Sequence, residues 1–364
     1  MKVLVLGGTG AMGVYLVDEL LGMGHEVVVT TRSNHDDNRE GLSYVIGNAR
    51  EESFLTQAIA GAHFDAVVDF MARPAAEFEK YLPTLTSSTE QYVYLSSYRV
   101  YADSPYITED SPRLLDVCED EGYLATNEYA LDKARCEDML KNSGNKNWTV
   151  VRPSVTFSRA RFQLGTLEAE DWLWRWEKGL EVPLSPEMLK RQATMTWGGD
   201  ASWFIAHLIG NDAAMGEIFN ICTSEHQPWY DVLETYQSVL PKPLNVRAVS
   251  AADYQRITAD HNFKYDRMYN RILSNEKVLA ATGRKQGDLK PMNQALASEL
   301  SAFLEEGIPI KTPSGSRQAR MDRYLGIRQN ARQFGEGANH YRLWRDLPLP
   351  LLRKLRPNPP YLCM

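Results

Sequence analysis

The sequence has few cysteines, no long apolar run and no metal-ligand motif. Its four cysteines, among 364 residues, form no C-x-x-C pair, and its seven histidines show no ligand spacing. Disulfides and a metal site are therefore not expected, and a reducing cytoplasm suits the chain. No apolar run approaches the roughly 20 residues that a membrane-spanning helix needs. The first such run is too short for a signal peptide, and glycines follow it where a cleavage site would be.

Charge is distributed unevenly along the chain. The net charge of −7 argues against nucleic acid as the main ligand. Residues 311–364 contain eleven Lys/Arg and three Asp/Glu, so this C-terminal extension is near +8 and the rest near −15. We expect the extension to pack on the acidic body or on a second subunit. Contact of the apolar-basic segment 347–360 with an anionic membrane surface or a partner is the alternative.

The first residues have the pattern of a βαβ unit with a glycine-rich turn. An apolar run over 2–6 is followed by G-G-T-G-A-M-G (7–13), a helical pattern and a second apolar run over 25–31. Gly7 would permit the exit from the strand, Gly10 the approach of a pyrophosphate, and Gly13 close packing of the helix on the sheet. The pattern predicts dinucleotide binding; the alternative is a turn that merely needs glycine.

The end of the second strand bears on the choice of dinucleotide. A carboxylate there would bind the ribose 2′-OH of NAD, but Thr31 stands at that position. Arg32 follows, and it could pair with a 2′-phosphate or stack on adenine. The pair favours NADP over NAD, although Asp36 and Asp37 could still supply a carboxylate.

A tyrosine and a lysine lie four residues apart further along the chain. Apolar runs over 64–72, 91–97 and 148–154 predict further buried strands, and Ser96-Ser97 ends the second of them. In open α/β sheets this carboxyl edge binds ligands. Tyr129 and Lys133 would share one helical face and could reach the same ligand. Taken alone, they could equally be an exposed helical pair.

These motifs, in their order, resemble a known family. They are the glycine turn, Y-L-S-S-Y-R-V-Y, Y-A-L-D-K, V-V-R-P, W-G-G-D-A-S and F-N-I-C. They resemble the extended short-chain dehydrogenase/reductases and, more narrowly, the NAD-dependent epimerase/dehydratase family, which modifies nucleotide-linked sugars. The resemblance covers residues 1 to about 310. It implies an α/β fold, which is a Rossmann-type doubly wound parallel sheet with a smaller α/β substrate lobe, and a cytoplasmic homodimer.

The resemblance also implies a domain division. Residues 1–155 would form the dinucleotide-binding domain, with 195–215 returning to it. Residues 156–194 and 216–310 would form the substrate lobe, and 311–364 the basic extension.

The family's catalytic residues correspond to Ser97, Tyr129 and Lys133. A free tyrosine has a pKa near 10, and a nearby ammonium favours its phenolate. Tyr129 would take the proton from a substrate hydroxyl as hydride leaves for the nicotinamide, and would return it in the reverse direction. Lys133 would supply the ammonium and bind the nicotinamide ribose, and Ser97 would hydrogen-bond the same substrate oxygen.

Further residues correspond to the family's binding sites. Those implied for the cofactor are Gly7, Thr9, Gly10, Ala11, Met12 and Gly13 at the phosphates, Thr31, Arg32, Asn48 and Ala49 on the adenosine side, and Phe70, Met71, Ala72, Ser96, Pro153, Ser154 and Val155 along the strand ends. Those implied for a substrate diphosphate and its surroundings are Arg159, Arg161, Arg191 and Tyr98. For the arginines, an ordinary surface position is the alternative.

Departures from the family pattern narrow the range of reactions that we expect. Dehydratases carry Asp-Glu after the catalytic residue, but Tyr98 and Arg99 stand here, so sugar 4,6-dehydration is not expected. Val155 replaces an Asn that many members place on the diphosphate, so the nucleotide-linked sugar rests on the family alone. Hydride transfer at a carbinol carbon remains. Family numbers favour an epimerase, whereas Thr31-Arg32 favours an NADP-dependent ketoreductase.

A function of another class stays open. V-V-D-F-M-A resembles the chloroplast stem-loop-binding proteins of this fold, which are linked to RNA, and the basic extension would be the feature to invoke. The acidic body and the Ser–Tyr–Lys set argue against such a non-catalytic RNA-binding or scaffold protein.

Two local patterns carry structural predictions. Trp172, Trp174 and Trp176 fall in a segment with helical flanks, where lobe packing is favoured over a sugar-stacking platform. Asp200 is predicted to be the N-cap of the next helix.

Overall fold

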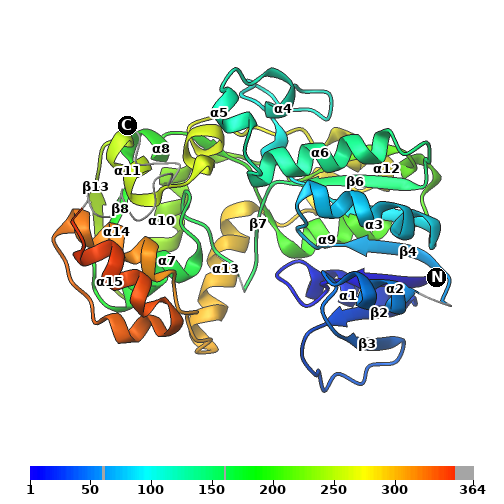
Figure 1. Cartoon of the computed structure of the whole chain (residues 1–364), viewed down its shortest axis with the longest axis horizontal. Coiled ribbons are helices and arrows are strands. Elements are labelled where there is room, and N and C mark those ends of the chain that lie inside the picture. The colour runs from blue at the N-terminus through cyan, green and yellow to red at the C-terminus, as the bar shows by residue number, and fades with distance from the viewer. Residues whose placement is uncertain (60–61, 160, 349–364) are drawn as a thin grey trace. The chain divides into compact units, whose positions relative to one another are not determined.

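The computed structural model describes residues 1–59, 62–159 and 161–348, and the chain divides into two compact units (Figure 1). Unit 1 comprises Met1–Ala160, Thr194–His226 and Arg271–Met292, and unit 2 comprises Arg161–Ala193, Gln227–Asn270 and Asn293–Met364. The segments 216–226 and 271–292, which the sequence analysis assigned to the substrate lobe, thus belong to unit 1.

A seven-stranded parallel sheet forms the centre of unit 1. Its strand order is β11-β6-β5-β4-β1-β2-β3. The strands up to β3 extend to one side of β1, and the chain then crosses to the other side of β1 to form β4. The predicted doubly wound, Rossmann-type fold is confirmed. The strands are β1 (Lys2–Leu6), β2 (Glu26–Thr31), β3 (Leu42–Ile46), β4 (Phe64–Asp69), β5 (Thr89–Leu95), β6 (Trp148–Pro153) and β11 (Glu217–Ile221).

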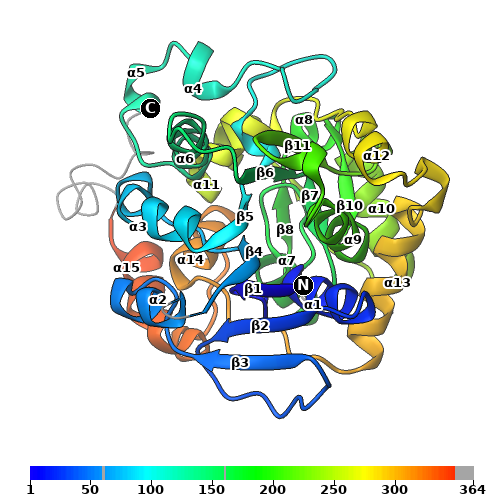
Figure 2. The same cartoon turned by 90° about the vertical axis from the view of Figure 1, so that its right-hand side faces the viewer.

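Helices cover both faces of this sheet, as Figure 2 shows. Val3 and Val5 of β1 pack into the core under α1 (Gly13–Gly22) and α9 (Gly198–Leu208), whereas Leu4 and Leu6 pack under α2 (Glu52–Ile59), α3 (Ala75–Ser87) and α6 (Tyr129–Lys141). Because alternate residues of a strand point to opposite faces, a strand buried on both faces reads as a continuous apolar run.

Shorter elements complete unit 1. They are η1 (Tyr98–Val100), α4 (Leu114–Val117), α5 (Glu121–Leu124), the paired strands β7 (Val155–Phe157) and β10 (Met195–Trp197), η2 (Asp212–Ala214), α12 (Glu276–Thr282) and η4 (Gln286–Asp288).

The predicted helix cap at Asp200 is wrong. Helix α9 begins at Gly198, so Asp200 lies in its first turn. The Asp200 carboxylate is buried, accepts from the Lys290 backbone N–H at 2.9 Å and pairs with Arg284 at 2.8 Å. It joins α9 to the segment after α12, a long-range structural role that its sequence position did not show.

Unit 2 consists of helices with two small strand pairs. Its elements are α7 (Ala169–Glu177), β8 (Val182–Leu184), α8 (Pro186–Leu189), β9 (Gln192–Ala193), β12 (Gln227–Pro228), α10 (Trp229–Val239), β13 (Val246–Ala248), α11 (Ala251–Thr258), η3 (Phe263–Arg267), α13 (Met292–Glu305), α14 (Gly315–Leu325), η5 (Ala331–Gly337) and α15 (Ala338–Asp346). Trp172, Trp174 and Trp176 of α7 are all buried, and Trp172 stacks on Tyr236. Their predicted role in packing is confirmed.

The basic extension packs within unit 2 over α14 to α15. Asp322 of α14 pairs with Arg175 of α7 at 2.8 Å, and both side chains are fully buried. Arg317 pairs with Asp171 at 2.7 Å. The expectation that the extension docks on the body is thus confirmed for 315–346, and most of the segment 347–360 lies outside the described residues. Within the described ranges, no helix is long and apolar enough to cross a membrane.

Candidate active site

The glycine turn after β1 is open around Gly10 and closely packed around Gly13. Gly7 has φ +77°, a conformation that favours glycine. A Cβ on Gly13 would lie 2.5 Å from the Gly8 carbonyl carbon and oxygen, so Gly13 lets α1 start directly against the turn. A Cβ on Gly10 would meet nothing nearer than the Gly7 oxygen at 3.8 Å. No side chain caps α1; the Val14 N–H donates to the Gly10 carbonyl at 3.2 Å, and the positive end of the helix lies at the turn, where a phosphate could bind.

The residues after β2 offer an exposed arginine to a ligand, whereas the carboxylate of Asp37 is already paired. The buried Thr31 hydroxyl contacts the Ser33 carbonyl at 3.2 Å and His35 Nε2 at 3.0 Å. Arg32 is exposed. Arg39 binds both Asp37 oxygens at 2.7–3.0 Å, and hydrogen bonds from Arg39 lower the pKa of Asp37. The carboxylate of Asp37 is therefore already engaged by Arg39.

A buried cluster fixes the loops that carry the adenosine-side residues. Asp69, the last residue of β4, pairs with Arg73 and accepts from the Tyr92 hydroxyl at 2.8 Å. Arg73 also donates to the Ala49 carbonyl at 2.7 Å. The loops after β3 and β4 are thereby held together. Sequence reasoning missed this cluster, whose only local signal is an acid at a strand end with an arginine four residues later.

The other residues predicted on this side lie in the same two loops. The backbone N–H of Phe70 donates to the Leu6 carbonyl at 3.1 Å, and the Met71 sulfur lies 3.1 Å from where a Gly7 Cβ would be. The Ala72 carbonyl accepts from Arg50 at 2.9 Å, and the Asn48 side chain is used in its own turn, with Glu51 and the Arg50 N–H at 3.2 Å. Phe70 and Met71 are thus gathered beside the glycine turn.

The Ser–Tyr–Lys residues meet at the carboxyl end of β5. Lys133 is 2% exposed, and its Nζ donates to the carbonyl of Leu95, the last residue of β5, at 2.5 Å. The same Nζ lies 5.7 Å from the ring centroid of Tyr129 and 4.6 Å from that of Tyr94. Ser97 follows two residues after Leu95, and its Oγ accepts from the Arg99 N–H at 3.2 Å. Tyr129, at 37% exposed, begins α6 and is accessible to a ligand.

A buried ion pair supports this arrangement from beneath. Ser96 Oγ donates to Glu137 Oε1 at 2.5 Å, so its hydroxyl faces the interior of unit 1. Glu137 lies one turn beyond Lys133 on α6 and pairs with Arg152 of β6 at 2.6 Å. Burial alone would raise the pKa of Glu137, but Arg152, Ser96 and Arg113 outweigh it and hold the pKa below its usual range. Arg152 also donates to the Tyr101 hydroxyl at 2.7 Å.

The residues predicted after β6 and around the substrate are divided between unit 1 and unit 2. Ser154 and Thr196 share a hydrogen bond of 2.7 Å, and Val155 is buried at the start of β7. Tyr98 is buried, with the Arg271 guanidinium 5.8 Å from its ring centroid. Arg159 lies in unit 1. Arg161 and Arg191 lie in unit 2, where Arg161 pairs with Glu168 at 3.3 Å.

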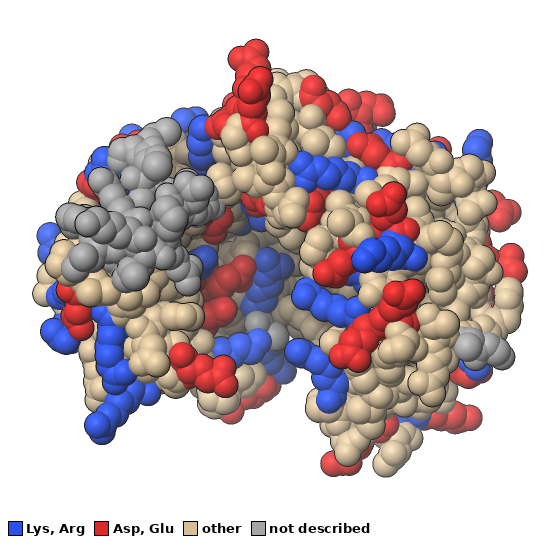
Figure 3. Space-filling view, in the orientation of Figure 1, with Lys and Arg blue, Asp and Glu red and all other residues tan. Residues whose placement is uncertain are grey.

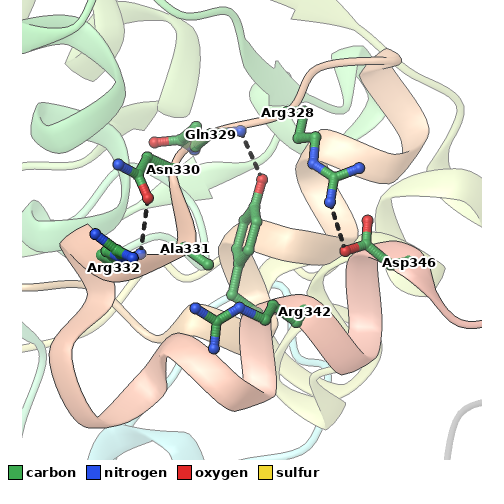
Figure 4. Close-up of a pocket in the computed structure, with 8 residues that line it drawn as sticks. Arg328, Gln329, Asn330, Ala331, Arg332, Arg342 and Asp346 are labelled. Atoms are coloured by element: carbon green, nitrogen blue, oxygen red, sulfur yellow. Dashed lines mark hydrogen bonds and ion pairs between the residues drawn. The ribbon is translucent and has the colours of Figure 1, made fainter.

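Unit 2 also contains a small cavity, of about 230 Å³, in its C-terminal segment (Figure 4). The Tyr341 hydroxyl accepts from the Gln329 N–H at 2.8 Å, and Arg328 pairs with Asp346 at 2.9 Å. Its lining consists of Arg328, Gln329, Asn330, Ala331, Arg332, Tyr341, Arg342 and Asp346, none of which is a predicted site residue.

Comparisons with known proteins agree with this geometry. Residues 3–167 match the model of the NAD dependent epimerase/dehydratase family. The chain is 27% identical over 235 residues to the chloroplast stem-loop binding protein of 41 kDa b of Arabidopsis thaliana, across 60% of this chain and 58% of that protein. It is 27% identical over 259 residues to the 2′-dehydrokanamycin reductase of Streptomyces kanamyceticus, across 69% and 70% of the two chains.

The fold is shared with solved enzymes. The UDP-glucose 4-epimerase of Thermus thermophilus, solved in complex with NAD, superposes with a TM-score of 0.63 at 19% identity, covering 84% of this chain and 99% of that one. Residues 3–167 thus match the model of the NAD dependent epimerase/dehydratase family, and the sheet order and the glycine turn of unit 1 are consistent with that match.

Proposed function

We propose that this protein is an NAD(P)-dependent oxidoreductase that transfers hydride at a carbinol carbon of a sugar. The observation that carries the proposal is the position of Lys133 Nζ. It is buried at the end of β5, between the Leu95 carbonyl and the rings of Tyr94 and Tyr129. An ammonium is costly to bury without a partner, and here it lies beside an exposed phenol.

The side chains divide the proton chemistry among them. Tyr129 Oη takes the proton of the substrate hydroxyl, and the Lys133 ammonium lies 5.7 Å from the centroid of its ring. The Ser97 hydroxyl, two residues beyond the strand end, hydrogen-bonds the same substrate oxygen and orients it. The glycine turn and the first turn of α1 bind the pyrophosphate of a dinucleotide, whose nicotinamide, when bound, accepts or supplies the hydride.

The substrate is proposed to be a nucleotide-linked sugar, and the reaction an epimerisation. The fold shared with the Thermus thermophilus UDP-glucose 4-epimerase and the family match of residues 3–167 support this choice. Neither Tyr98 nor Arg99 can replace the carboxylic acids that 4,6-dehydration requires, so the proposal excludes that reaction.

An NADP-dependent ketoreductase is the second candidate, and it shares the same proton chemistry. Arg32 is exposed at the end of β2, and Asp37 is bound by Arg39, so a 2′-phosphate would meet a cation there rather than a free Asp37 carboxylate. The similarity to 2′-dehydrokanamycin reductase over 69% of the chain supports this candidate.

RNA binding has less support. The similarity to a stem-loop binding protein favours it, but the face in Figure 3 carries acidic and basic side chains side by side rather than a continuous basic stripe. The arginines of α14 that would form such a stripe are used internally, as in the pair of Arg317 with Asp171.

The test is to identify what the purified protein binds. Released ligand is identified by mass spectrometry, and the stripped protein is titrated with NAD and NADP. Tightly held NAD supports an epimerase that retains its cofactor, and an empty site with NADP preference supports the reductase. Binding of neither dinucleotide would contradict the proposal, and RNA binding lost on raising salt would then become the better account.

A further inference from the structure

Arg99 connects the two residues that are proposed to act on the substrate oxygen. Its backbone N–H donates to Ser97 Oγ at 3.2 Å. Its guanidinium carbon lies 5.3 Å from the ring centroid of Tyr129, slightly closer than Lys133 Nζ at 5.7 Å. Tyr129 therefore has two cations near its ring, one from its own helix and one from the turn η1.

The Arg99 side chain is held in this position by a built set of contacts. Its Nη2 pairs with Glu128 Oε1 at 2.5 Å, and the two side chains are 17% and 11% exposed. Glu128 is the N-cap of α6, where its Oε2 accepts from the Ala130 N–H at 2.8 Å and from the Tyr123 hydroxyl at 3.0 Å. With both carboxylate oxygens engaged, Glu128 orients the guanidinium and fixes the start of the helix that carries Tyr129.

We propose that Arg99 is a positioning residue that holds the Tyr129 ring against η1 and so sets the place of the Tyr129 hydroxyl relative to Ser97. The inference deepens the proposed hydride transfer and rests on it. A guanidinium is planar and can stack on a ring while it keeps an ion pair at its edge, which a lysine cannot do. Arg99 thereby couples the place of Ser97 to that of Tyr129.

The inference is tested by a double-mutant cycle between Arg99 and Tyr129. In the wild-type background, Arg99→Gln should lower kcat/KM by up to about 10²-fold, because a misplaced acid–base group loses rate steeply. In a Tyr129→Phe background the same substitution should have little further effect, since Arg99 acts through that ring. Arg135→Gln, which removes an arginine from the same helix, is the matched control and should leave kcat/KM in place.

Turnover and dinucleotide affinity, measured separately, provide the second readout. With UDP-glucose and UDP-galactose as probes and NAD or NADP as cofactor, Arg99→Gln should lower kcat while the calorimetric affinity for the dinucleotide stays that of the wild type. Arg99→Lys keeps the charge and loses the planar stack, so we expect it to lower kcat/KM as well. This variant also serves if Arg99→Gln does not fold.

The outcomes separate the two proposals. A wild-type kcat/KM in Arg99→Gln or Arg99→Lys, or an equal loss from Arg99→Gln in the Tyr129→Phe background, would overturn the role of Arg99 while leaving hydride transfer intact. Failure of the wild-type protein to bind either dinucleotide, or wild-type turnover in Tyr129→Phe, would instead count against the proposed function itself.

Discussion

Glu137 and Arg152 form a two-point ion pair in the interior of unit 1, with Arg152 Nη2 at 2.6 Å and Nε at 2.9 Å from the Glu137 carboxylate oxygens. The two side chains are at most 1% exposed. Because Glu137 lies one helical turn beyond Lys133 and accepts from Ser96, this pair joins α6, β5 and β6 directly below the candidate active site.

Breaking this pair from one side should destabilise the protein strongly. Glu137→Gln leaves Arg152 buried without its counter-charge, and we expect a loss of about 3–5 kcal/mol in the free energy of unfolding. Denaturant unfolding measures it. Glu181→Gln, which breaks the exposed pair with Arg247 at 2.8 Å, is the matched control and should cost at most about 1 kcal/mol.

The same pair predicts a pH dependence of stability. The folded-state pKa of Glu137 is held below its unfolded value, so its contribution is present above the unfolded pKa, near 4.3, and is lost as pH falls through the folded pKa. Wild-type stability should therefore fall more steeply below about pH 4.3 than that of Glu137→Gln. Parallel curves for the two proteins would show that Glu137 does not titrate differently on folding.

Substitution at Tyr129 should separate binding from turnover. Tyr129→Phe removes the hydroxyl from a ring that is 37% exposed, so the fold and dinucleotide affinity should remain. Turnover should fall by roughly 10²–10⁴-fold, the usual contribution of an acid–base group. Calorimetric binding of NAD and NADP and a steady-state assay check the two halves. Wild-type turnover in this variant would refute the mechanism.

The glycine turn offers two alanine substitutions with opposite expected effects. Gly13→Ala places a Cβ 2.5 Å from backbone atoms of Gly8, so it should lower the free energy of unfolding by about 1–3 kcal/mol. Gly10→Ala meets no protein atom nearer than 3.8 Å, so it should fold normally and lose dinucleotide affinity. Gly22→Ala, with nothing within 4 Å, is the control. Undiminished affinity in Gly10→Ala would place the pyrophosphate elsewhere.

Cofactor choice should depend on Arg32. Arg32→Ala removes the exposed cation at the end of β2, and we expect NADP affinity to fall by about 1.5–3 kcal/mol, the value of a hydrogen bond to a charged group, with NAD affinity unchanged. NAD is thus the internal control. Equal losses for both cofactors would mean that Arg32 contacts adenine or the shared pyrophosphate.

Much of the fold followed from local patterns. The apolar runs predicted β1, β2, β4, β5 and β6 because strands buried on both faces must be apolar throughout. The four-residue spacing predicted that Tyr129 and Lys133 would share a helix, which is α6. Asp200 shows the limit of this reasoning. Its sequence position suited a cap, but its partners Arg284 and Lys290 are more than 80 residues away.

The sequence by itself determined the parallel sheet, the glycine turn and the order of the family's motifs, because these depend on periodicity and spacing within short segments. Only the tertiary structure decided that Arg73 closes two loops on Asp69, that Arg99 lies against Tyr129, and that the F-N-I of F-N-I-C belongs to the sheet in β11. Each of these depends on which distant segments become neighbours. Strand order and the need to pair every buried charge decide which segments become neighbours. Local periodicity and spacing in the sequence do not contain this information.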